Sequence, residues 1–448
     1  MRVIPVVDEG LGNSSYLVDL GDGRALAVDP SRDLRALDAE AGKRGLVVVA
    51  AADTHLHADF LSGATRLAAR DGAAVYASAT GGRAFPHTGL ADGDEVDLGG
   101  LTLRAWETPG HTGEHLSFLL LDAGRVLGVF TGGSLIVGAA ARTDLVSPEQ
   151  TEVLARAQHA SLRRLATLPD DTAVYPTHGA GSFCSAPPGA ERTSTIGRER
   201  QTNPLLAAAD EDAFVAQLLG GLGTFPPYFL RLGELNRLGP SLQGAAGLAP
   251  LGPDEVVALH RRGAEVVDVR APVAYAAGHL PGSLAITLRG AFATWLGWLV
   301  PDPGTPLVVV RDPAQDPDEV VWQARKIGYD NLAGELLGGV DAWRAAGQPV
   351  ARTALLQPGQ VDPAQVVDVR QASEYTGGHL PTALNVELGD LATHDLPAGP
   401  LVTMCGHGER AATGASLLER RGRTDVAVLA GGPQEWADTT GGHLQVGA

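Results

Sequence analysis

Short apolar runs, each bounded by glycine, proline or aspartate, follow one another through the first half of the chain. Residues 16–20, 25–28 and 46–51 are such runs, and apolar stretches of this length between turn-forming residues are typical of buried strands. Residues 150–168 differ, because their apolar positions recur at the spacing of a helical turn. The pattern therefore predicts an α/β fold built from short strands and amphipathic helices.

Two passages rich in proline and glycine interrupt this pattern. Residues 238–253 separate a large N-terminal part from the remainder, and residues 357–363 divide that remainder again. A chain of 448 residues has room for about three domains of ordinary size. We therefore predict domains at residues 1–240, 253–350 and 360–447.

The second and third of these parts repeat one module. The letters VVDVR at 266–270 and GHLP at 278–281 recur at 366–370 and 378–381. Each copy closes with a Gly-Gly pair followed by a tryptophan. A pattern repeated over such a length indicates two domains of the same fold.

One thiol, Cys405, lies in a glycine-rich turn between an apolar strand at 401–404 and a helix-prone run at 411–420. Backbone N–H groups converge at a turn of this kind, where they lower the pKa of a thiol and can hold the outer sulfur of a persulfide. Arg410 adds a positive charge. The alternative is that Cys405 is a small buried hydrophobe, but its glycine and charged neighbours argue against burial.

The two copies resemble the rhodanese family. The resemblance rests on the Asp-Val-Arg and Gly-His-Leu-Pro elements, the six-residue loop at 405–410 and the terminal Gly-Gly-x-x-x-Trp. Rhodaneses are doubly wound α/β domains that pass a sulfane sulfur between donors and thiols through a cysteine persulfide. The resemblance implies that thiosulfate or sulfite and small thiols are partners, and that Cys405 is the nucleophile. The residues implied to cradle its persulfide are Gly406, His407, Gly408, Glu409 and Arg410.

The first copy departs from this family pattern at its most important position. When the two copies are aligned, Cys405 falls opposite Arg311. Because an arginine cannot carry a sulfane sulfur, the copy at 253–350 is implied to be a pseudo-rhodanese.

Composition narrows the range of partners. A net charge of −18 without a Lys/Arg-rich run speaks against nucleic acid and against an anionic membrane surface, so a small molecule is the expected partner. Two cysteines, Cys184 and Cys405, cannot form a disulfide framework and suit a reducing compartment. The first residues lack a signal-peptide pattern, and apolar stretches such as 292–300 are too short to span a bilayer. We expect a cytoplasmic enzyme.

Four histidines follow apolar or extended segments of the N-terminal part. His55 and His57 belong to Thr-His-Leu-His-Ala-Asp, where alternate residues of an extended chain project to one side. His111 and His178 each lie in a turn after such a segment. A lone loop histidine usually has no ligand role, whereas four at strand ends, with Asp59 beside the pair, indicate a present or former metal site.

Residues 1–240 resemble the metallo-β-lactamase fold, a four-layer αβ/βα sandwich with its metal at one edge of the two sheets. The likeness is to the persulfide dioxygenase branch, through Phe-Thr-Gly-Gly-Ser-Leu at 130–135, Arg-Thr-Asp-Leu at 142–145 and His-Gly-Ala-Gly-Ser-Phe-Cys at 178–184. Members hold mononuclear Fe(II) with two histidines and one aspartate, and they oxidise a small-molecule persulfide with O2 to sulfite. They often dimerise, so a homodimer is a further expectation.

The ligands of that branch carry over only in part. The two histidines map to His55 and His111, but the aspartate maps to Gly133, and Phe60 stands where the fold's His-x-His-x-Asp-His has its last histidine. Both losses count against a binuclear hydrolytic site. A mononuclear site remains, and sequence does not choose between Fe(II) and Zn(II) for it. Its expected ligands are His55, His57 and His111, with Asp59 or His178 nearby.

A second cysteine enters through the same resemblance. In relatives fused to rhodanese domains, a cysteine after the same His-Gly-Ala-Gly-Ser pattern lies near the metal and takes or passes sulfur, and here it is Cys184. The alternative is a half-buried structural residue.

Three hypotheses follow, in order of preference. In the first, the N-terminal domain oxidises persulfides at an Fe(II) site, and Cys405 relays sulfur between sulfite, thiosulfate and thiols. In the second, the N-terminal domain holds no metal and binds a ligand, which leaves only sulfur transfer. In the third, the metal is Zn(II) and the domain hydrolyses a thioester, as glyoxalase II does.

Overall fold

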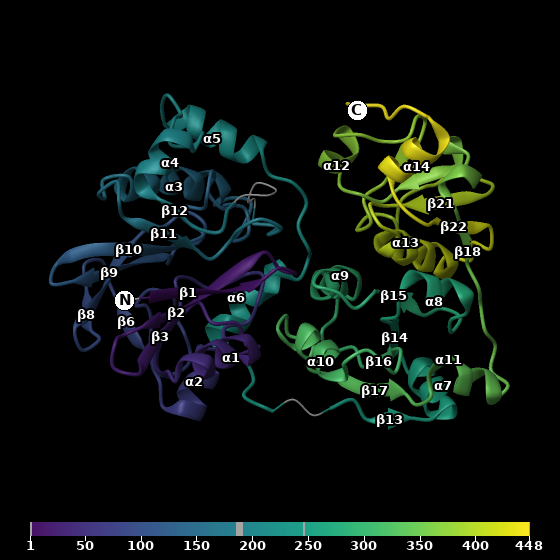
Figure 1. The fold of residues 1–448 in the computed structure, drawn as a ribbon, viewed down its shortest axis with the longest axis horizontal. Helices are drawn as coiled ribbons and strands as arrows, with labels where there is room; N and C mark the ends of the chain where they lie inside the picture. The colour runs from purple at the N-terminus through teal and green to yellow at the C-terminus, as the bar shows by residue number, and fades with distance from the viewer. Residues whose placement is uncertain (1, 185–190, 245–246, 448) are drawn as a thin grey trace. The chain divides into compact units, whose positions relative to one another are not determined.

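The structure is a computed structural model that describes residues 2–184, 191–244 and 247–447 (Figure 1). The chain divides into two compact units. The first comprises Met1–Gly244 and Trp322–Gly328, and the second comprises Ala245–Val321 and Tyr329–Ala448.

Two six-stranded sheets form the centre of the first unit, in the orders β1-β2-β3-β4-β5-β6 and β12-β11-β10-β9-β8-β7. In the first sheet, β1 to β3 are antiparallel and β3 to β6 are parallel. Its strands are β1 (Arg2–Asp8), β2 (Asn13–Asp19), β3 (Arg24–Val28), β4 (Val47–Ala52), β5 (Ala74–Ser78) and β6 (Thr88–Leu90). Those of the second are β7 (Glu95–Asp97), β8 (Leu101–Glu107), β9 (Leu116–Asp122), β10 (Arg125–Gly132), β11 (Ala173–Pro176) and β12 (Ser194–Thr195).

Helices cover the outer face of each sheet. Leu37 of α1 and Leu67 of α2 pack on the first sheet, while Leu162 of α3 and Phe214 of α5 pack on the second. The helices of this unit are α1 (Arg35–Arg44), α2 (Ala64–Asp71), α3 (Thr151–Leu165), α4 (Ile196–Thr202), α5 (Glu211–Gly220) and α6 (Phe229–Leu238). Four layers result, and they confirm the predicted αβ/βα sandwich (Figure 1).

The inner faces of the two sheets meet in one apolar cluster. Tyr16 and Leu26 of the first sheet pack against Phe118 and Phe130 of the second, and all four are fully buried. Because β2 lies between this cluster and the outer helices, five of its seven residues are buried. A strand covered on both faces reads as a continuous apolar run, which is why residues 16–20 were recognisable as a strand.

The second unit contains two parallel five-stranded sheets, ordered β13-β17-β16-β14-β15 and β18-β22-β21-β19-β20. Equivalent strands occupy equivalent places, as the repeated sequence predicts. The first copy consists of β13 (Pro250–Leu251), α7 (Pro253–Arg261), β14 (Glu265–Asp268), α8 (Pro272–Ala277), β15 (Leu284–Ala285), α9 (Phe292–Leu299), β16 (Leu307–Val310), α10 (Pro317–Arg325), β17 (Leu332–Leu336) and α11 (Gly339–Ala345). The second consists of β18 (Ala354–Leu356), η1 (Pro358–Gln360), η2 (Pro363–Gln365), β19 (Val366–Asp368), α12 (Ala372–Thr376), β20 (Leu384–Asn385), β21 (Leu401–Met404), α13 (Glu409–Arg420), β22 (Val426–Leu429) and α14 (Pro433–Thr440).

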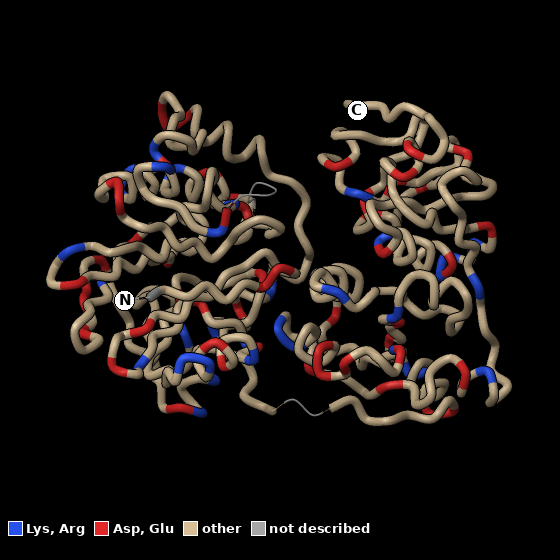
Figure 2. The backbone as a smooth tube through the Cα atoms, in the orientation of Figure 1, with Lys and Arg blue, Asp and Glu red and all other residues tan. Residues whose placement is uncertain are grey.

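Acidic and basic positions intermix along the backbone of both units (Figure 2). Many of these side chains form ion pairs on the surface, such as Arg70 with Asp38 and Arg164 with Asp92. Exposed pairs of this kind contribute little to stability. Among the described residues, every helix is too short or too polar to cross a bilayer.

Candidate functional site

Three histidines from three separate loops meet at one edge of the two sheets. His55 follows β4, His111 follows β8 and His178 follows β11. Their ligand atoms lie within 4.8 Å of one another, and all three side chains are buried. The first unit therefore brings together imidazoles that lie far apart in the sequence.

Each of these rings is held in place through its Nδ1 atom. The Nδ1–H groups of His55, His111 and His178 donate to Thr54 Oγ1 (2.9 Å), the Arg142 carbonyl (2.6 Å) and Asn13 Oδ1 (3.1 Å). The direction of the hydrogen bond between His55 and Thr54 is fixed, because the Thr54 hydroxyl donates its own hydrogen to Asp29. Hydrogen bonds of this kind fix the tautomer of a metal-binding histidine and leave Nε2 as the ligand atom.

The Nε2 atoms face one another across a polar gap. His55 Nε2 and His178 Nε2 are 3.4 Å apart, which is about the separation of two tetrahedral ligands with metal–nitrogen bonds of about 2.1 Å. His111 Nε2 is buried and has no hydrogen-bond partner among the described residues. A buried nitrogen without a hydrogen-bond partner destabilises the fold. A divalent metal would give a partner to the Nε2 atoms of all three histidines. The residues present therefore fit a metal ion.

The protonation of two of these rings suits a ligand role. Burial, with repulsion from neighbouring histidines, lowers the pKa of His55 well below its ordinary value and lowers the pKa of His111 to about 3. Both rings are therefore neutral at pH 7, and the neutral imidazole is the form that binds metals.

Asp59 and Cys184 form a second buried group with His178. Asp59 Oδ2 lies 3.3 Å from His178 Nδ1 and 4.0 Å from Cys184 Sγ. Burial lowers the pKa of His178, but the combined effect of Cys184 and Asp59 is larger and raises it well above its ordinary value. His178 therefore belongs to both groups, and either a proton or a metal can occupy its Nε2 side.

Cys405 lies where expected, in the turn between β21 and α13, but its side chain is only 1% exposed. The expectation that its neighbours would keep it from burial was wrong, because the turn folds over the thiol. Gly408, at φ +97°, donates its N–H to Cys405 Sγ at 3.1 Å. The terminal Gly-Gly pair closes the other side, since a Cβ on Gly432 would lie 2.4 Å from the Gly406 carbonyl.

The guanidinium of Arg410 lies beside this loop in a bidentate pair with Glu374, at 2.6 and 2.8 Å. Burial raises the pKa of Glu374, but Arg410 outweighs that effect and lowers it. Of the other residues of the predicted cradle, His407 is exposed and Gly406 and Glu409 are half-buried. The cradle of Cys405 therefore consists of the Gly408 backbone N–H and of the positive charge of Arg410, which is already paired with Glu374.

Comparisons with known proteins agree with this geometry. Residues 8–178 match the model of the metallo-beta-lactamase superfamily, and residues 252–346 and 352–439 match that of the rhodanese-like domain. The human mitochondrial persulfide dioxygenase ETHE1 is 30% identical over 217 residues, which are 48% of this chain and 78% of that protein. The chain belongs to the metallo-beta-lactamase superfamily.

Two further relatives show how broad this superfamily is. A hydroxyacylglutathione hydrolase of Methylobacterium sp. (strain 4-46) is 34% identical over 183 residues, 35% of this chain and 68% of that protein. A solved structure of a metallo-beta-lactamase from Staphylococcus aureus superposes with a TM-score of 0.66 at 30% identity, covering 75% of this chain and 98% of that one. The fold is therefore shared by proteins named for different activities.

Gly133 and Phe60 occupy the two positions at which the resemblance leads us to expect an aspartate and a histidine. A Cβ on Gly133 would lie 2.3 Å from Cδ2 of His111, so an aspartate does not fit there unless His111 moves. Phe60 stacks on His57, with ring centroids 4.2 Å apart. A carboxylate ligand at 133 and a histidine ligand at 60 are both absent, and neighbouring side chains fill the space.

His57 lies beside the three histidines without joining them. Its Nε2 is 3.1 Å from Asp29 Oδ1, and with Asp53 these residues form a separate buried group. Burial raises the pKa of Asp29, but His57 and the Thr177 hydroxyl outweigh that effect and lower it. Four of the five predicted ligands therefore lie together, namely His55, His111, His178 and Asp59. The fifth, His57, forms a hydrogen bond with Asp29 instead.

Besides Asn13 and Asp29, which contact His178 and His57, sequence reasoning missed two further polar residues at this site. His115 is fully buried, stacks on His55 at 5.1 Å and accepts the Gly133 N–H at 3.0 Å. Gln158 of α3 accepts the His111 N–H at 2.8 Å. The spacing of His111 and His115 was a visible signal for the first, whereas nothing near Gln158 distinguishes it from any polar residue on a helix.

Proposed function

We propose that this chain is a sulfide-metabolising enzyme in which a metal domain oxidises small-molecule persulfides with O2 and a rhodanese domain transfers sulfur through Cys405. The observation that carries the proposal is the set of three anchored imidazoles on the same chain as a thiol held by a backbone N–H. The match to human ETHE1, which is named as a persulfide dioxygenase, supports the first activity. The rhodanese-like match over residues 352–439 supports the second.

His55, His111 and His178 would hold the metal, and Asp59 with Asn13 would orient His178. Bound Fe(II) would supply the redox chemistry by which a persulfide, O2 and water give the thiol, sulfite and two protons. Three neutral imidazoles leave the full charge of a divalent ion, one unit more than two histidines and an aspartate would leave. That charge favours an anionic persulfide over a neutral thiol.

Iron is the metal we propose, and zinc is the alternative, because both accept imidazole ligands. Cys184, next to His178 and Asp59, is proposed to take or pass sulfur at this site. Its Sγ lies 4.0 Å from the Asp59 carboxylate, in the buried group that includes the metal-binding His178.

At Cys405 the proposed chemistry is a pair of sulfur transfers. The Cys405 thiolate attacks the outer sulfur of thiosulfate, the new S–S bond forms, and sulfite leaves with the electron pair of the broken S–S bond. An acceptor thiolate then attacks that outer sulfur and releases the Cys405 thiolate. The Gly408 N–H faces the thiol and stabilises its anion, which is the state that begins and ends the cycle.

Metal analysis of protein purified without added metal or chelator is the first test. We expect about one iron per chain, O2 uptake with glutathione persulfide, and sulfite as product. His111→Ala should lose the metal, whereas His87→Ala, a matched control at a half-buried histidine bonded to the Phe85 carbonyl, should keep it. Cys405→Ser should keep O2 uptake and lose sulfur transfer, which separates the two activities.

The lack of space for a carboxylate at Gly133 favours a second candidate, a sulfurtransferase whose metal domain only binds a ligand. Protein without metal and without O2 uptake would establish that function in place of the first. Zinc with thioester hydrolysis would instead establish the activity for which the hydroxyacylglutathione hydrolases are named, although Phe60 and Gly133 oppose a two-metal site. The free cysteines support a cytoplasmic location, and a homodimer stays a prediction.

A further inference from the structure

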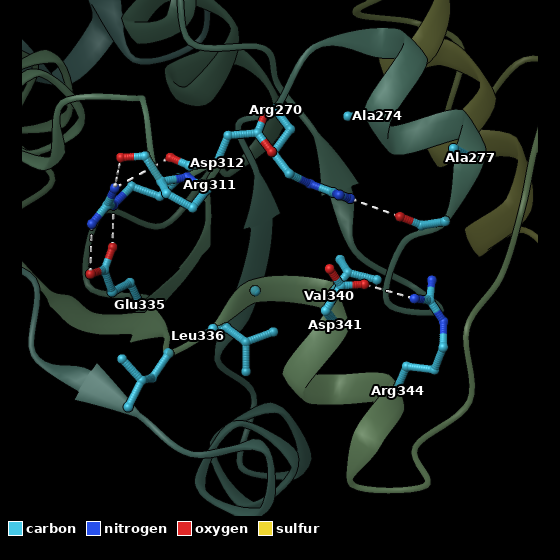
Figure 3. A pocket seen from close by; sticks show the side chains of 15 residues that line it. Arg270, Ala274, Ala277, Arg311, Asp312, Glu335, Leu336, Val340, Asp341 and Arg344 are labelled. Carbon is cyan, nitrogen blue, oxygen red and sulfur yellow. Dashed lines mark hydrogen bonds and ion pairs between the residues drawn. The ribbon is translucent and has the colours of Figure 1, made fainter.

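The first rhodanese copy contains a pocket of about 540 Å³ at the carboxyl end of β16, beside the turn that corresponds to the Cys405 loop. Pockets that bind small molecules typically measure about 300–1,000 Å³. Figure 3 shows its charged lining around an open centre. The residues that line it include Arg270, Ala274, Arg311, Asp312, Glu335 and Arg344.

This pocket is open because the pair that closes the corresponding place in the second copy has no counterpart. There, Arg410 and Glu374 form two hydrogen bonds across the mouth of the loop. The first copy has Ala274 in place of Glu374, and an acid, Asp316, at the spacing of Arg410. A methyl group and a carboxylate cannot bridge the gap, so the space beneath stays accessible.

Arg311, which replaces the nucleophile, does not itself offer a binding group. Its Nε and Nη2 donate to the carboxylate of Glu335, and its Nη1 donates to the Gln315 carbonyl at 2.9 Å. The two side chains neutralise each other and hold the longer turn of this copy (Figure 3). Arg311 thus shapes one wall and leaves recognition to other residues.

Two guanidinium groups retain N–H donors that face the pocket. Arg270 is 9% exposed and uses Nε and Nη2 on Asp268 and on the Gly278 carbonyl, so Nη1 has no partner among the described residues. Arg344 donates from Nη1 to Asp341, and its Nη2 lies 3.4 Å from where a Cβ on Gly278 would be. Both guanidinium groups therefore lie close to Gly278.

A carboxylate stands near this pair of cations. Asp312 lines the same pocket, and its carboxylate accepts no hydrogen bond from any described residue. It is close enough to Arg270 that it adds to Asp268 in raising the arginine's pKa against the lowering effect of burial. Because the charges of Arg311 and Glu335 neutralise each other, the pocket presents the positive charges of Arg270 and Arg344 together with the negative charge of Asp312.

We propose that this pocket binds a small zwitterion of amino-acid type, an amino acid or a short peptide, with its carboxylate on Arg270 and Arg344 and its ammonium on Asp312. Guanidinium groups match a carboxylate in geometry and charge. A compact dianion such as sulfate or thiosulfate would bring two negative charges towards Asp312 and Asp341 and is disfavoured. The site goes beyond the proposed function and does not rest on it, because binding requires no turnover.

The test uses the full chain and unreactive probes, S-methylcysteine and S-methylglutathione, whose blocked sulfur cannot react with Cys405 or Cys184. Calorimetric titration gives the number of sites, and hydrogen exchange locates them. We expect a site whose occupation by a probe protects residues 311–316 and 338–344, in addition to any binding of S-methylglutathione at the domains proposed to act on glutathione persulfide. Ala274→Glu should remove that site, because the longer acid fills the mouth as Glu374 does in the second copy.

Two further variants make the outcome specific. Val273→Glu adds the same charge one residue earlier, at a side chain that is 62% exposed and outside the pocket, and should bind as the wild type does. Arg344→Ala, at an arginine with a 52% exposed side chain, should weaken binding about tenfold. Protection of residues 311–316 and 338–344 that is unchanged in Ala274→Glu, probe binding without protection of these residues, no binding of either probe, or protection of these residues by thiosulfate at a lower concentration than by the probes would each overturn the proposal.

Discussion

The two rhodanese copies share a fold and differ at the place where sulfur chemistry would occur. In both, the buried arginine of the Asp-Val-Arg element makes the same bonds to its aspartate, at 2.9 and 2.6 Å, and to a glycine carbonyl at 2.8 Å. The turn after the central strand differs, because it holds a thiol in one copy and an ion-paired arginine in the other. The repeat thus preserves what supports the sheet while the loop above it has diverged.

Contacts between the copies suggest why the first is retained. Glu419, near the end of the helix that follows the Cys405 loop, accepts hydrogen bonds from Thr353, from Tyr275 and from His279 Nε2 at 3.1 Å. The backbone N–H of Ala285 donates to Ser416 of the same helix. The first copy therefore holds α13 through the Glu419 carboxylate, which it shares with Thr353 of the segment that leads into β18.

The nucleophile provides the largest difference between the copies. Cys405→Ser should reduce sulfur transfer from thiosulfate to cyanide or glutathione by at least about a thousandfold, because a hydroxyl cannot carry a sulfane sulfur. The converse change, Arg311→Cys, should give no activity, since it leaves Glu335 unpaired and supplies no tight turn. Initial rates with thiosulfate measure both, and activity in Arg311→Cys would show that the loop is less important than we argue.

The shared ion pairs should behave alike. Asp368→Ala leaves the buried Arg370 without its partner, and Asp268→Ala does the same to Arg270, so each should lower the free energy of unfolding of its copy by about 3–5 kcal/mol. Chemical denaturation followed by hydrogen exchange distinguishes the copies. A loss confined to the second copy would mean that the Asp-Val-Arg element serves the thiol loop rather than the sheet.

Local pattern made much of this predictable. The strands near residues 16–20 and 25–28 and the helix over 150–168 were visible because apolar periodicity reports burial of neighbouring positions, and the repeat revealed two related domains. The turn at Cys405 was visible for the same reason, although its burial was not. Burial depends on how Gly432 closes over the loop, which is a contact between distant segments.

The metal group shows the limit of such reasoning. His55, His111 and His178 could be proposed one by one from their loops, but their meeting depends on three strands from two sheets. The pairing of His57 with Asp29 spans 28 residues, and that of Cys184 with Asp59 spans 125. No periodicity encodes a contact of that range, so sequence grouped His57 with the ligands on spacing alone.

A smaller effect should come from the turn itself. Gly408→Ala places a side chain at φ +97°, which costs about 1–2 kcal/mol and disturbs the N–H that faces Cys405 Sγ. We expect sulfur transfer to fall about tenfold. Gly406→Ala is the matched control, because a Cβ there meets nothing within 4 Å. Equal rates in the two variants would remove the Gly408 N–H from the mechanism.

The smallest predicted effect concerns the pair that closes the second copy. Arg410 depresses the pKa of Glu374, so the stabilisation from this pair is fully present above the carboxyl's ordinary pKa of about 4.3 and is lost as pH falls through the lower folded value. We therefore expect alkylation of Cys405 by iodoacetamide, corrected for the thiolate fraction, to stay constant from pH 7 to about pH 5. Below pH 4, access to the thiol should increase in the wild type. Glu374→Gln should show high access at every pH, because the glutamine lacks the charge that holds Arg410, and Asp438→Asn, at an exposed acid of α14 that accepts a hydrogen bond from Gln434, should follow the wild type. Equal access in all three proteins would mean that the open pocket of the first copy does not result from the missing ion pair, and the contrast between Ala274 and Glu374 would need another cause.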